Sequence, residues 1–523
     1  MVSTAAQARP PIAALAVAGY GAVLGSLFPL MAVMTGADIS GGLSVAADSG
    51  ALVNTSQNIG AVVGILIAPS FAAGIGRGRT MVLTGTGFVL ASVACALAPS
   101  LGLMLLARFV HGVFGGVLPL LFMLLVMTSL RPGEGKFEGM TLFATSTTLF
   151  FGLAASVGAL LVDTWGWRAL FWAQAIAAGP YCIAASRVLT SEKGRQGVLG
   201  STDWISHALL SFGLGLILIA LSEGERHFWL EAWWIPAMLV GGTIFTAFAV
   251  YNLLTAARPL LTLAVFRRST FSWAIALSLI FRFGSLFAIF IVPAYLGRIQ
   301  GFRPAEIGEV LAWMTPAAAV SIVVAWAVAR HWDTRWLLSA GLGCFALASY
   351  LCVGLGSEWA VEQLREAAAI AGFGMGLFAV AVLRYAVFGA TMQDGPTVGV
   401  IFNLARVFGI VVGLAILSHL VAEREKFHSA ILTERLAATD PETAQRLALS
   451  AGSFSRFSAD AVAAQRDALA GLSRAAAGQA FTLAFADAFT VTAIALALGA
   501  ILVWALPGIP AEVAPATRER SLA

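Results

Sequence analysis

The chain has 523 residues, of which 59% are hydrophobic and only 11% are charged, and its mean hydropathy is +0.88. Soluble domains carry roughly 25% charged residues, so the composition excludes a globular protein coated by water. The net charge of +4 comes from basic residues scattered over short turns, which excludes a nucleic-acid-binding patch. We therefore predict an all-α polytopic membrane protein.

Fourteen apolar stretches take up most of the sequence, and each can cross the membrane as a helix of about 20 residues. The first stretch has no clear cleavage site of small residues, so we predict an anchor rather than a cleaved signal peptide. The predicted spans are residues 11–34, 51–75, 81–100, 103–129, 139–162, 169–187, 205–222, 233–254, 271–294, 307–329, 335–355, 367–390, 397–420 and 480–505.

Basic residues in the short connections fall mainly on one side of the predicted membrane. With both chain ends included, about 15 lysines and arginines lie on that side and about 5 on the other. The richer side is the cytoplasmic one by the positive-inside rule. We therefore expect a multi-pass protein of the plasma membrane (bacterial inner membrane) with both termini cytoplasmic.

The spans divide as six, two and six. Two six-helix bundles around a site near the midplane are the plan of many secondary transporters, here with two extra spans in the linker. The predicted parts are a cytoplasmic N-terminus (1–10), an N-terminal bundle (11–188), a linker with two spans (189–270), a C-terminal bundle (271–506) that includes an external helical loop (421–478), and a cytoplasmic tail (507–523).

The 421–478 segment is polar, rich in alanine and helical in pattern, with Asp440-Pro441 as a helix start signal. We expect a small helical cap outside the membrane. It is either a solvated connector or a docking surface for a partner.

Motifs for common enzyme chemistry are missing from the sequence. There is no P-loop, no H-E-x-x-H zinc motif and no G-x-S-x-G nucleophile elbow. The six histidines form no metal-ligand pattern, and the four cysteines lie inside predicted spans at unrelated spacings. We expect no enzyme activity, no metal and no cofactor, with a proton gradient as the energy source.

Four arginines lie inside predicted spans: Arg108, Arg282, Arg384 and Arg406. Each costs about 2.5–3.5 kcal/mol to insert, so we expect function at these positions. Because arginine exceeds carboxylate inside the spans, we predict a cationic cavity. Arg282, Arg384 and Arg406, with Asn403 beside them, are the candidate substrate-binding residues. The alternative is that these arginines are structural and bond to helix carbonyls.

The fourth span contains Arg108-Phe109-Val110-His111-Gly112, which resembles the R-x-x-Q-G motif of the major facilitator superfamily, with His111 in place of glutamine. The resemblance links Arg108 to proton transfer and Gly112 to the conformational machinery. Arg108 and His111 share one helix face. His111 either loads and releases a proton or stays neutral and forms hydrogen bonds as the glutamine amide would.

Three further segments resemble motifs of the same family. Gly76, Arg77 and Arg79 match the turn motif G-x-L-a-D-R-x-G-R, although Ala73 stands at its acidic position. The stretch Asp163–Phe171 is similar to D-x-x-G-W-R-x-x-F. Of the antiporter motif in span five only Gly158 remains.

With Asn403–Gly409 similar to an N-x-x-R-x-x-G run in span thirteen, the chain resembles the fourteen-span drug:proton antiporter branch, and its EmrB-like members most. The resemblance implies the major facilitator fold and a small-molecule substrate in a lipid bilayer. It also implies a periplasmic membrane-fusion adaptor and an outer-membrane channel if the host has two membranes.

The first span lacks the carboxylate that many antiporters of this branch have. The acidic candidates for proton coupling are therefore Asp38, Asp48, Glu309 and Asp487, near the external ends of spans. We favour Glu309 as the partner of an intramembrane arginine, and keep Asp48 as a second coupling candidate.

The sequence thus predicts proton-driven efflux of amphiphilic organic compounds or drugs, anionic ones among them, by alternating access. Two alternatives remain open. One is proton-coupled uptake of an organic anion, and the other is a membrane scaffold that transports nothing.

Overall fold

The computed structural model describes residues 12–130, 134–189, 194–195, 197–256, 259, 261–436, 440–454 and 460–509. Every regular element within these residues is a helix. The predicted tail 1–10 and residues 510–523 of the predicted tail 507–523 lie outside the described residues, so they do not test the prediction about the two termini.

The first six spans form the N-terminal bundle. They are α1 (Ile12–Met34), α3 (Ala47–Ile75), α4 (Arg77–Leu97), α5 with α6 (Leu101–Gly115 and Val117–Ser129), α7 with η1 and α8 (Glu134–Thr148, Phe151–Leu153 and Ala154–Trp165), and α9 (Trp167–Val188); the short α2 (Gly36–Gly42) follows α1.

Two linker spans and the C-terminal spans follow. They are α10 (Trp204–Glu223), α11 (Trp234–Thr255), α12 (Ser269–Leu286) continued by η4 (Phe287–Ile291), α13 (Val292–Tyr295) and η5 (Leu296–Gln300), α14 with α15 (Pro304–Ala312 and Met314–Val328), α16 (Thr334–Leu351), α17 (Val361–Val387), α18 (Gly395–Arg435) and α20 (Ala461–Leu502); α19 (Pro441–Phe454) lies between the last two.

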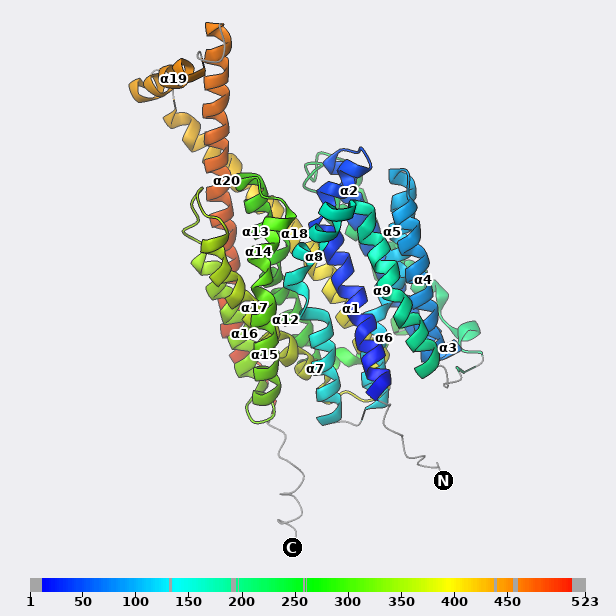
Figure 1. The fold of residues 1–523 in the computed structure, drawn as a ribbon. Helices are drawn as coiled ribbons and strands as arrows, with labels where there is room; N and C mark the ends of the chain where they lie inside the picture. The colour runs from blue at the N-terminus through cyan, green and yellow to red at the C-terminus, as the bar shows by residue number, and fades with distance from the viewer. Residues whose placement is uncertain are drawn as a thin grey trace, which may run out of the picture.

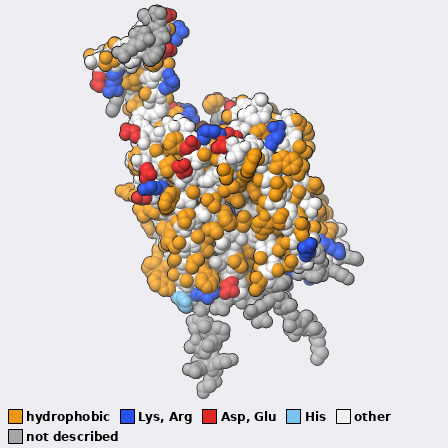
Figure 2. Space-filling model, viewed as in Figure 1, with side chains coloured by type: hydrophobic (Ala, Val, Ile, Leu, Met, Phe, Trp, Pro, Cys, Tyr) orange, Lys and Arg blue, Asp and Glu red, His pale blue; other side chains and the backbone are white. Residues whose placement is uncertain are grey.

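Within the described residues, thirteen helical segments are long and apolar enough to cross a membrane. The remaining predicted span corresponds to α16, which has 18 residues and packs between α17 and α20. Apolar side chains cover the sides of the body, and charged ones gather toward its ends (Figure 2). The fourteen predicted spans therefore each coincide with a helix, and the protein is a multi-pass membrane protein.

Helix α1 begins, and α20 ends, at the same face of the body (Figure 1). We call this face the terminus side. The opposite face carries α2 and a helical projection made of α19 and the adjoining ends of α18 and α20 (Figure 1). We call that face the arm side, and we call residues 421–436, 440–454 and 460–479 the arm.

The arm differs from the separate cap that the sequence predicts. Helix α18 runs for 41 residues and α20 for 42, so two membrane spans continue without a break beyond the body. The predicted start signal at Asp440 is confirmed, since its carboxylate accepts hydrogen bonds from the backbone N–H and the hydroxyl of Thr443 at 3.0 and 2.9 Å. The backbone hydrogen bond from Thr443 lowers the pKa of Asp440 below its ordinary value.

Glycines let α3 and α5 approach closely. A Cβ on Gly60 would lie 2.0 Å from the carbonyl oxygen of Phe109, and one on Gly112 would lie 2.1 Å from that of Gln57. Small residues at such contacts replace hydrophobic collapse as the means of packing helices inside lipid. The motif glycine Gly112 therefore fixes the position of α5 against α3.

We expect Gly112→Ala to lower the thermal stability of the purified protein, because overpacking of this kind costs typically 1–3 kcal/mol. Differential scanning fluorimetry in detergent measures the change. Gly102→Ala is the matched control in the same helix, since a Cβ there meets nothing within 4 Å. An unchanged melting temperature for Gly112→Ala would show that α5 can shift away from α3 at no cost.

Candidate transport cavity

A cavity of about 190 Å³ lies between the two bundles. Its walls come from α1, α3 and α7 on one side and from α12, α17 and α18 on the other. Ligand pockets for drug-sized molecules measure about 300–1,000 Å³. The cavity must therefore widen to admit a substrate of that size, which requires the bundles to move relative to each other.

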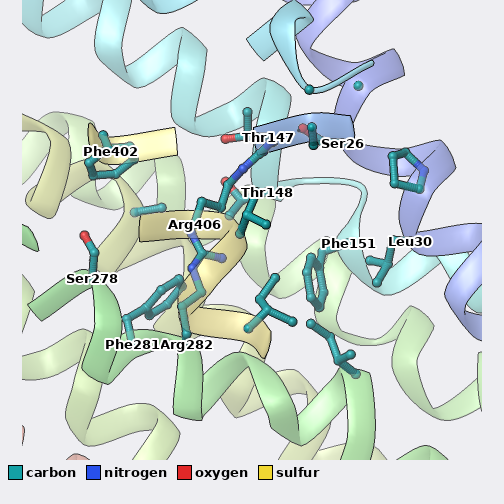
Figure 3. Close-up of a pocket in the computed structure, with 18 of the residues that line it drawn as sticks. Ser26, Leu30, Thr147, Thr148, Phe151, Ser278, Phe281, Arg282, Phe402 and Arg406 are labelled. Atoms are coloured by element: carbon teal, nitrogen blue, oxygen red, sulfur yellow. Dashed lines mark hydrogen bonds between the residues drawn. The ribbon is translucent and has the colours of Figure 1, made fainter. Parts of the chain in front are cut away.

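Two arginines from the C-terminal bundle reach this cavity (Figure 3). Arg406 of α18 donates a hydrogen bond from Nη1 to the hydroxyl of Ser26 on α1, at 3.0 Å. Arg282 of α12 lies along α18, and a Cβ on Gly409 would be only 2.6 Å from its Cγ. Gly409 is one helical turn from Arg406, so the absent side chain at 409 brings the two guanidinium groups to the same part of the cavity.

The charge of these arginines is not balanced within the cavity. No acidic residue occurs among the described residues that line it. The Nε of Arg282 is buried without a hydrogen-bond partner, and its guanidinium carbon lies 5.2 Å from the ring centroid of Phe281. The lining is thus cationic at one end, as the sequence predicts for Arg282 and Arg406.

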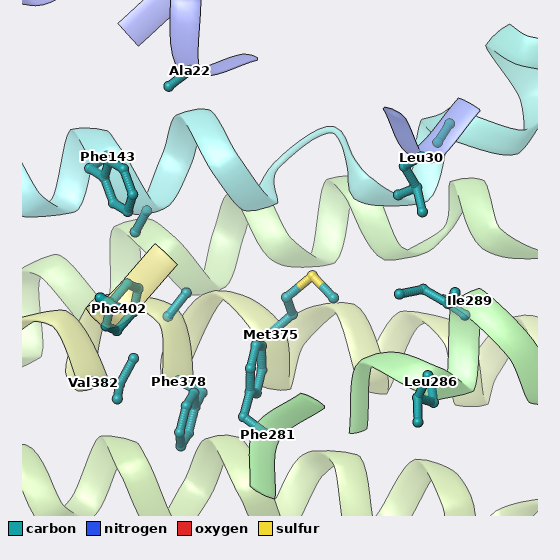
Figure 4. Close-up of a cluster of buried hydrophobic side chains, with 14 of the residues drawn as sticks. Ala22, Leu30, Phe143, Phe281, Leu286, Ile289, Met375, Phe378, Val382 and Phe402 are labelled. Atoms are coloured by element: carbon teal, nitrogen blue, oxygen red, sulfur yellow. The ribbon is translucent and has the colours of Figure 1, made fainter. Parts of the chain in front are cut away.

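Apolar side chains form much of the remaining wall. Phe143, Phe281, Phe402, Met375 and Ile289 lie around the same space (Figure 4). Ile289 belongs to η4, a π-helical turn within the ninth span, and such turns occur often at functional sites. A cationic end and an apolar wall suit a molecule with one anionic group and an apolar body.

Arg108 and His111 lie behind the cavity, inside the N-terminal bundle. Both are fully buried, and the Arg108 Nη2 donates a long hydrogen bond of 3.4 Å to Asn54 Oδ1. Asn54 itself lines the cavity. Arg108 therefore touches the cavity wall through Asn54 without lining the cavity itself.

The ring of His111 lies 4.4 Å from that of Phe88, centroid to centroid. Neither ring nitrogen has a hydrogen-bond partner among the described residues, and the same holds for both side-chain amide atoms of the neighbouring Gln174. Buried polar groups without partners cost about 1–3 kcal/mol each, so this cluster favours hydration or rearrangement in another conformation.

The bundles also meet on the terminus side of the cavity. Lys136, in the first turn of α7, donates to the backbone carbonyl of Ala390 at 3.2 Å, and Glu138 pairs with Arg330 at 2.9 Å. The motif residue Arg77 instead donates to Thr128 and Ser129 within its own bundle. The turn motif lacks its acidic residue, because Ala73 stands at that position. The contact between the bundles on this side is thus made by residues outside the motif.

A second contact between the bundles lies on the arm side. The Ser156 hydroxyl of α8 donates to the carbonyl of Gly308 on α14 at 2.9 Å, and a Cβ on Gly308 would lie 2.7 Å from the backbone nitrogen of Ser156. Nearby, Arg303 pairs with Asp163 at 2.6 Å. Contacts on both sides of the cavity explain its small volume.

The remaining motif residues have local roles. Gly76 has φ +96°, which a side chain would strain, so it permits the turn between α3 and α4. Arg79 is exposed beside it. Gly158 of α8 packs against α1, where a Cβ would lie 3.2 Å from the methyl group of Thr35.

Four predicted site residues lie away from the cavity. Arg384 lies near the terminus-side end of α17, with its guanidinium carbon 5.4 Å from the ring centroid of Phe137. The Asn403 amide donates to the carbonyl of Gly399 on its own helix at 2.9 Å. Glu309 is exposed on α14, and no ion pair within the described residues joins it to an intramembrane arginine. Asp48 is exposed and lies 3.9 Å from Arg226.

Several polar residues of the cavity were not singled out by the sequence. Ser26, Asn54, Gln57, Thr147 and Thr148 all line it. Each is a polar residue in a predicted span, which is the signal that could have found them. Such residues are common in membrane helices, however. Only the direction in which each helix turns its side chains distinguishes these five residues from other polar residues of the spans.

Two helical bundles around a shared, partly polar cavity define a membrane transporter rather than an enzyme. The chain belongs to the major facilitator superfamily, whose family model matches residues 12–414.

Curated relatives are drug transporters of this superfamily. The chain is 23% identical over 439 residues to the multidrug resistance protein Stp of Mycobacterium tuberculosis, covering 84% of this chain and 80% of that protein. It is 22% identical over 437 residues to the multidrug export protein EmrB of Escherichia coli, covering 82% and 83%. These relatives confirm the resemblance to EmrB-like members.

The fold is also that of solved transporters. The crystal structure of the human organic anion transporter MFSD10 superimposes with a TM-score of 0.57 at 13% identity, over 93% of this chain and all of that one. Together these findings make the protein a secondary transporter with the major facilitator fold.

Proposed function

We propose that this protein exports amphiphilic organic anions, driven by proton entry. The observation that carries the proposal is the pair Arg282 and Arg406 in a cavity whose described lining holds no acidic residue. A guanidinium forms a rigid fork that matches a carboxylate or sulfonate, and the phenylalanines of the cavity wall suit an apolar body. Arg384, Asn403, Glu309 and Asp48 are not part of this proposal, because they lie outside the cavity.

The membrane potential favours export of an anion. Moving one charge through 100 mV supplies about 2.3 kcal/mol, equal to roughly a fifty-fold gradient at about 1.36 kcal/mol per tenfold. If one proton enters as one monoanion leaves, both charges move in the favourable direction. A monocation exchanged for one proton would gain nothing from the potential.

We assign proton transfer to Arg108 and His111. Their cluster lies next to the cavity through Asn54, and imidazole is a side chain that can take up and release a proton during a cycle. The coupling group in this proposal is therefore a histidine inside the N-terminal bundle, in place of the carboxylate of many antiporters.

Orientation and partners complete the proposal. The terminus side faces the cytoplasm, as the excess of basic residues there supports, and the arm then points outward, where a membrane-fusion adaptor can reach it. A cysteine at exposed Leu449, carrying a photo-crosslinker in cells, tests the contact. Recovery of no adaptor, in cells where export is active, would contradict it.

Accumulation of an anionic fluorescent amphiphile in cells tests the function itself. Cells that produce the protein should hold less of the dye than control cells, and a protonophore should abolish the difference. Greater accumulation in producing cells would instead indicate uptake, and equal accumulation for a panel of anionic, neutral and cationic dyes would favour the scaffold.

A further inference from the structure

The substrate-free cavity poses an electrostatic problem. The guanidinium of Arg282 donates no hydrogen bond to the described residues and forms no ion pair with them, and its Nε is buried. Arg406 is bonded only to a neutral hydroxyl, that of Ser26. Two guanidinium groups thus share a small space between bundles that touch on both sides of it, and no carboxylate among the described lining residues balances them.

A transporter that exports an anion must also return without it. During that return the cavity is closed to both sides, and unbalanced charges in a low dielectric are strongly disfavoured. Two carboxylates near each other can share a proton to relieve repulsion, but arginine stays protonated. An anion from solution can balance the two charges.

Resting on the proposed function, we propose that a small monovalent anion of the size of chloride binds between Arg282 and Arg406 when the organic substrate is absent. The organic anion and the small anion then occupy the same site alternately and are exchanged in each cycle.

The geometry of the site fits such an ion. The volume of about 190 Å³ is below that of drug-sized pockets but ample for a chloride with a few waters. Donors dominate the charged end, since the free N–H groups of Arg282 and Arg406 point into the same space (Figure 3). Behind the wall Arg108 adds a third positive charge, joined to Asn54 at 3.4 Å.

Exchange changes the charge moved in a cycle. An organic monoanion leaving while chloride enters moves no net charge, so only the entering proton contributes. The net movement per cycle falls from two charges to one.

Binding is tested with the full-length protein in lipid nanodiscs, in sodium gluconate buffers in which chloride replaces gluconate at constant ionic strength. We expect chloride, bromide and nitrate to raise the melting temperature saturably. Arg282→Gln and Arg406→Gln should each weaken the chloride affinity about tenfold or more, whereas Arg365→Gln, at an exposed arginine paired with Glu362, should not.

A chloride effect that does not saturate, or that is equal in Arg282→Gln, would overturn the inference. Because a variant can fail to fold, the wild-type protein provides a second measurement. Dodecanoate serves as the amphiphilic organic anion, and chloride should raise its apparent Kd in proportion to the chloride concentration. Dodecanoate loaded inside proteoliposomes should accelerate the uptake of radioactive chloride.

The two proposals fail separately. If dodecanoate stabilises the protein and chloride neither binds nor competes, the chloride site is wrong and organic anion export stands. If chloride binds saturably but organic anions neither bind nor displace it, the chloride site stands and the proposed export of organic anions is wrong.

Discussion

Arg406→Gln is expected to lower Vmax/KM for export of an anionic amphiphile roughly 10- to 100-fold in proteoliposomes. Hydrogen bonds to charged groups contribute about 1.5–3 kcal/mol, and about 1.4 kcal/mol corresponds to tenfold. The methyl ester of the same amphiphile has no charge for the arginine to bind, so its export should change little. The ratio of the two rates measures the specific contribution of the guanidinium.

Arg406→Lys separates charge from shape. Lysine retains the positive charge but loses the planar fork, so an intermediate loss is expected. Arg365→Gln should leave the export of both compounds unchanged, because the Arg365 side chain is exposed, pairs with Glu362 and does not line the cavity. An equal loss for acid and ester in Arg406→Gln would mean that Arg406 holds α18 against α1 through Ser26 and does not bind substrate.

Hydropathy predicts this fold well for a physical reason. A helix must be long enough to cross the hydrocarbon core, and every backbone group inside lipid must be satisfied within the helix. Each predicted span, from 11–34 to 480–505, therefore coincides with a helix of the structure. The same measure cannot say where a helix ends in water, and it missed the continuation of α18 to Arg435.

The candidate site was predicted less completely than the fold, because the function of a residue depends on the direction in which its helix turns the side chain. Arg282 and Arg406 line the cavity, but Arg384 does not. All three are arginines in apolar helices, and the sequence offers no means of separating them. Position along the helix decides here, since Arg384 lies only a few residues before the end of α17 and is buried near Phe137, away from the cavity lining.

The structure also differs from the prediction made for Glu309. Its place near the start of a span suggested a partner for a buried arginine, yet it is exposed on α14. The neighbouring Gly308 points toward α8, and successive residues on a helix point about 100° apart. The close contact that needs Gly308 at the interface thus turns Glu309 away from it.

His111→Gln is expected to preserve the fold and to flatten the pH dependence of export, because glutamine has no titratable proton. Glutamine stands at this position in the family motif, so it fits the packing against Phe88. In the wild-type protein, export should rise as the external medium becomes more acidic. In the variant the export rate should no longer depend on the external pH.

Other titratable groups near His111 could also alter the pH profile, so a control variant is needed. Arg108 lies on the same face of α5, and Cys95 of α4 is the further titratable group that interacts with Arg108. Cys95→Ser serves as the control and should keep the wild-type pH profile. An unaltered profile in His111→Gln would assign His111 the neutral role of the family glutamine, and the coupling proton would then have to enter by another group.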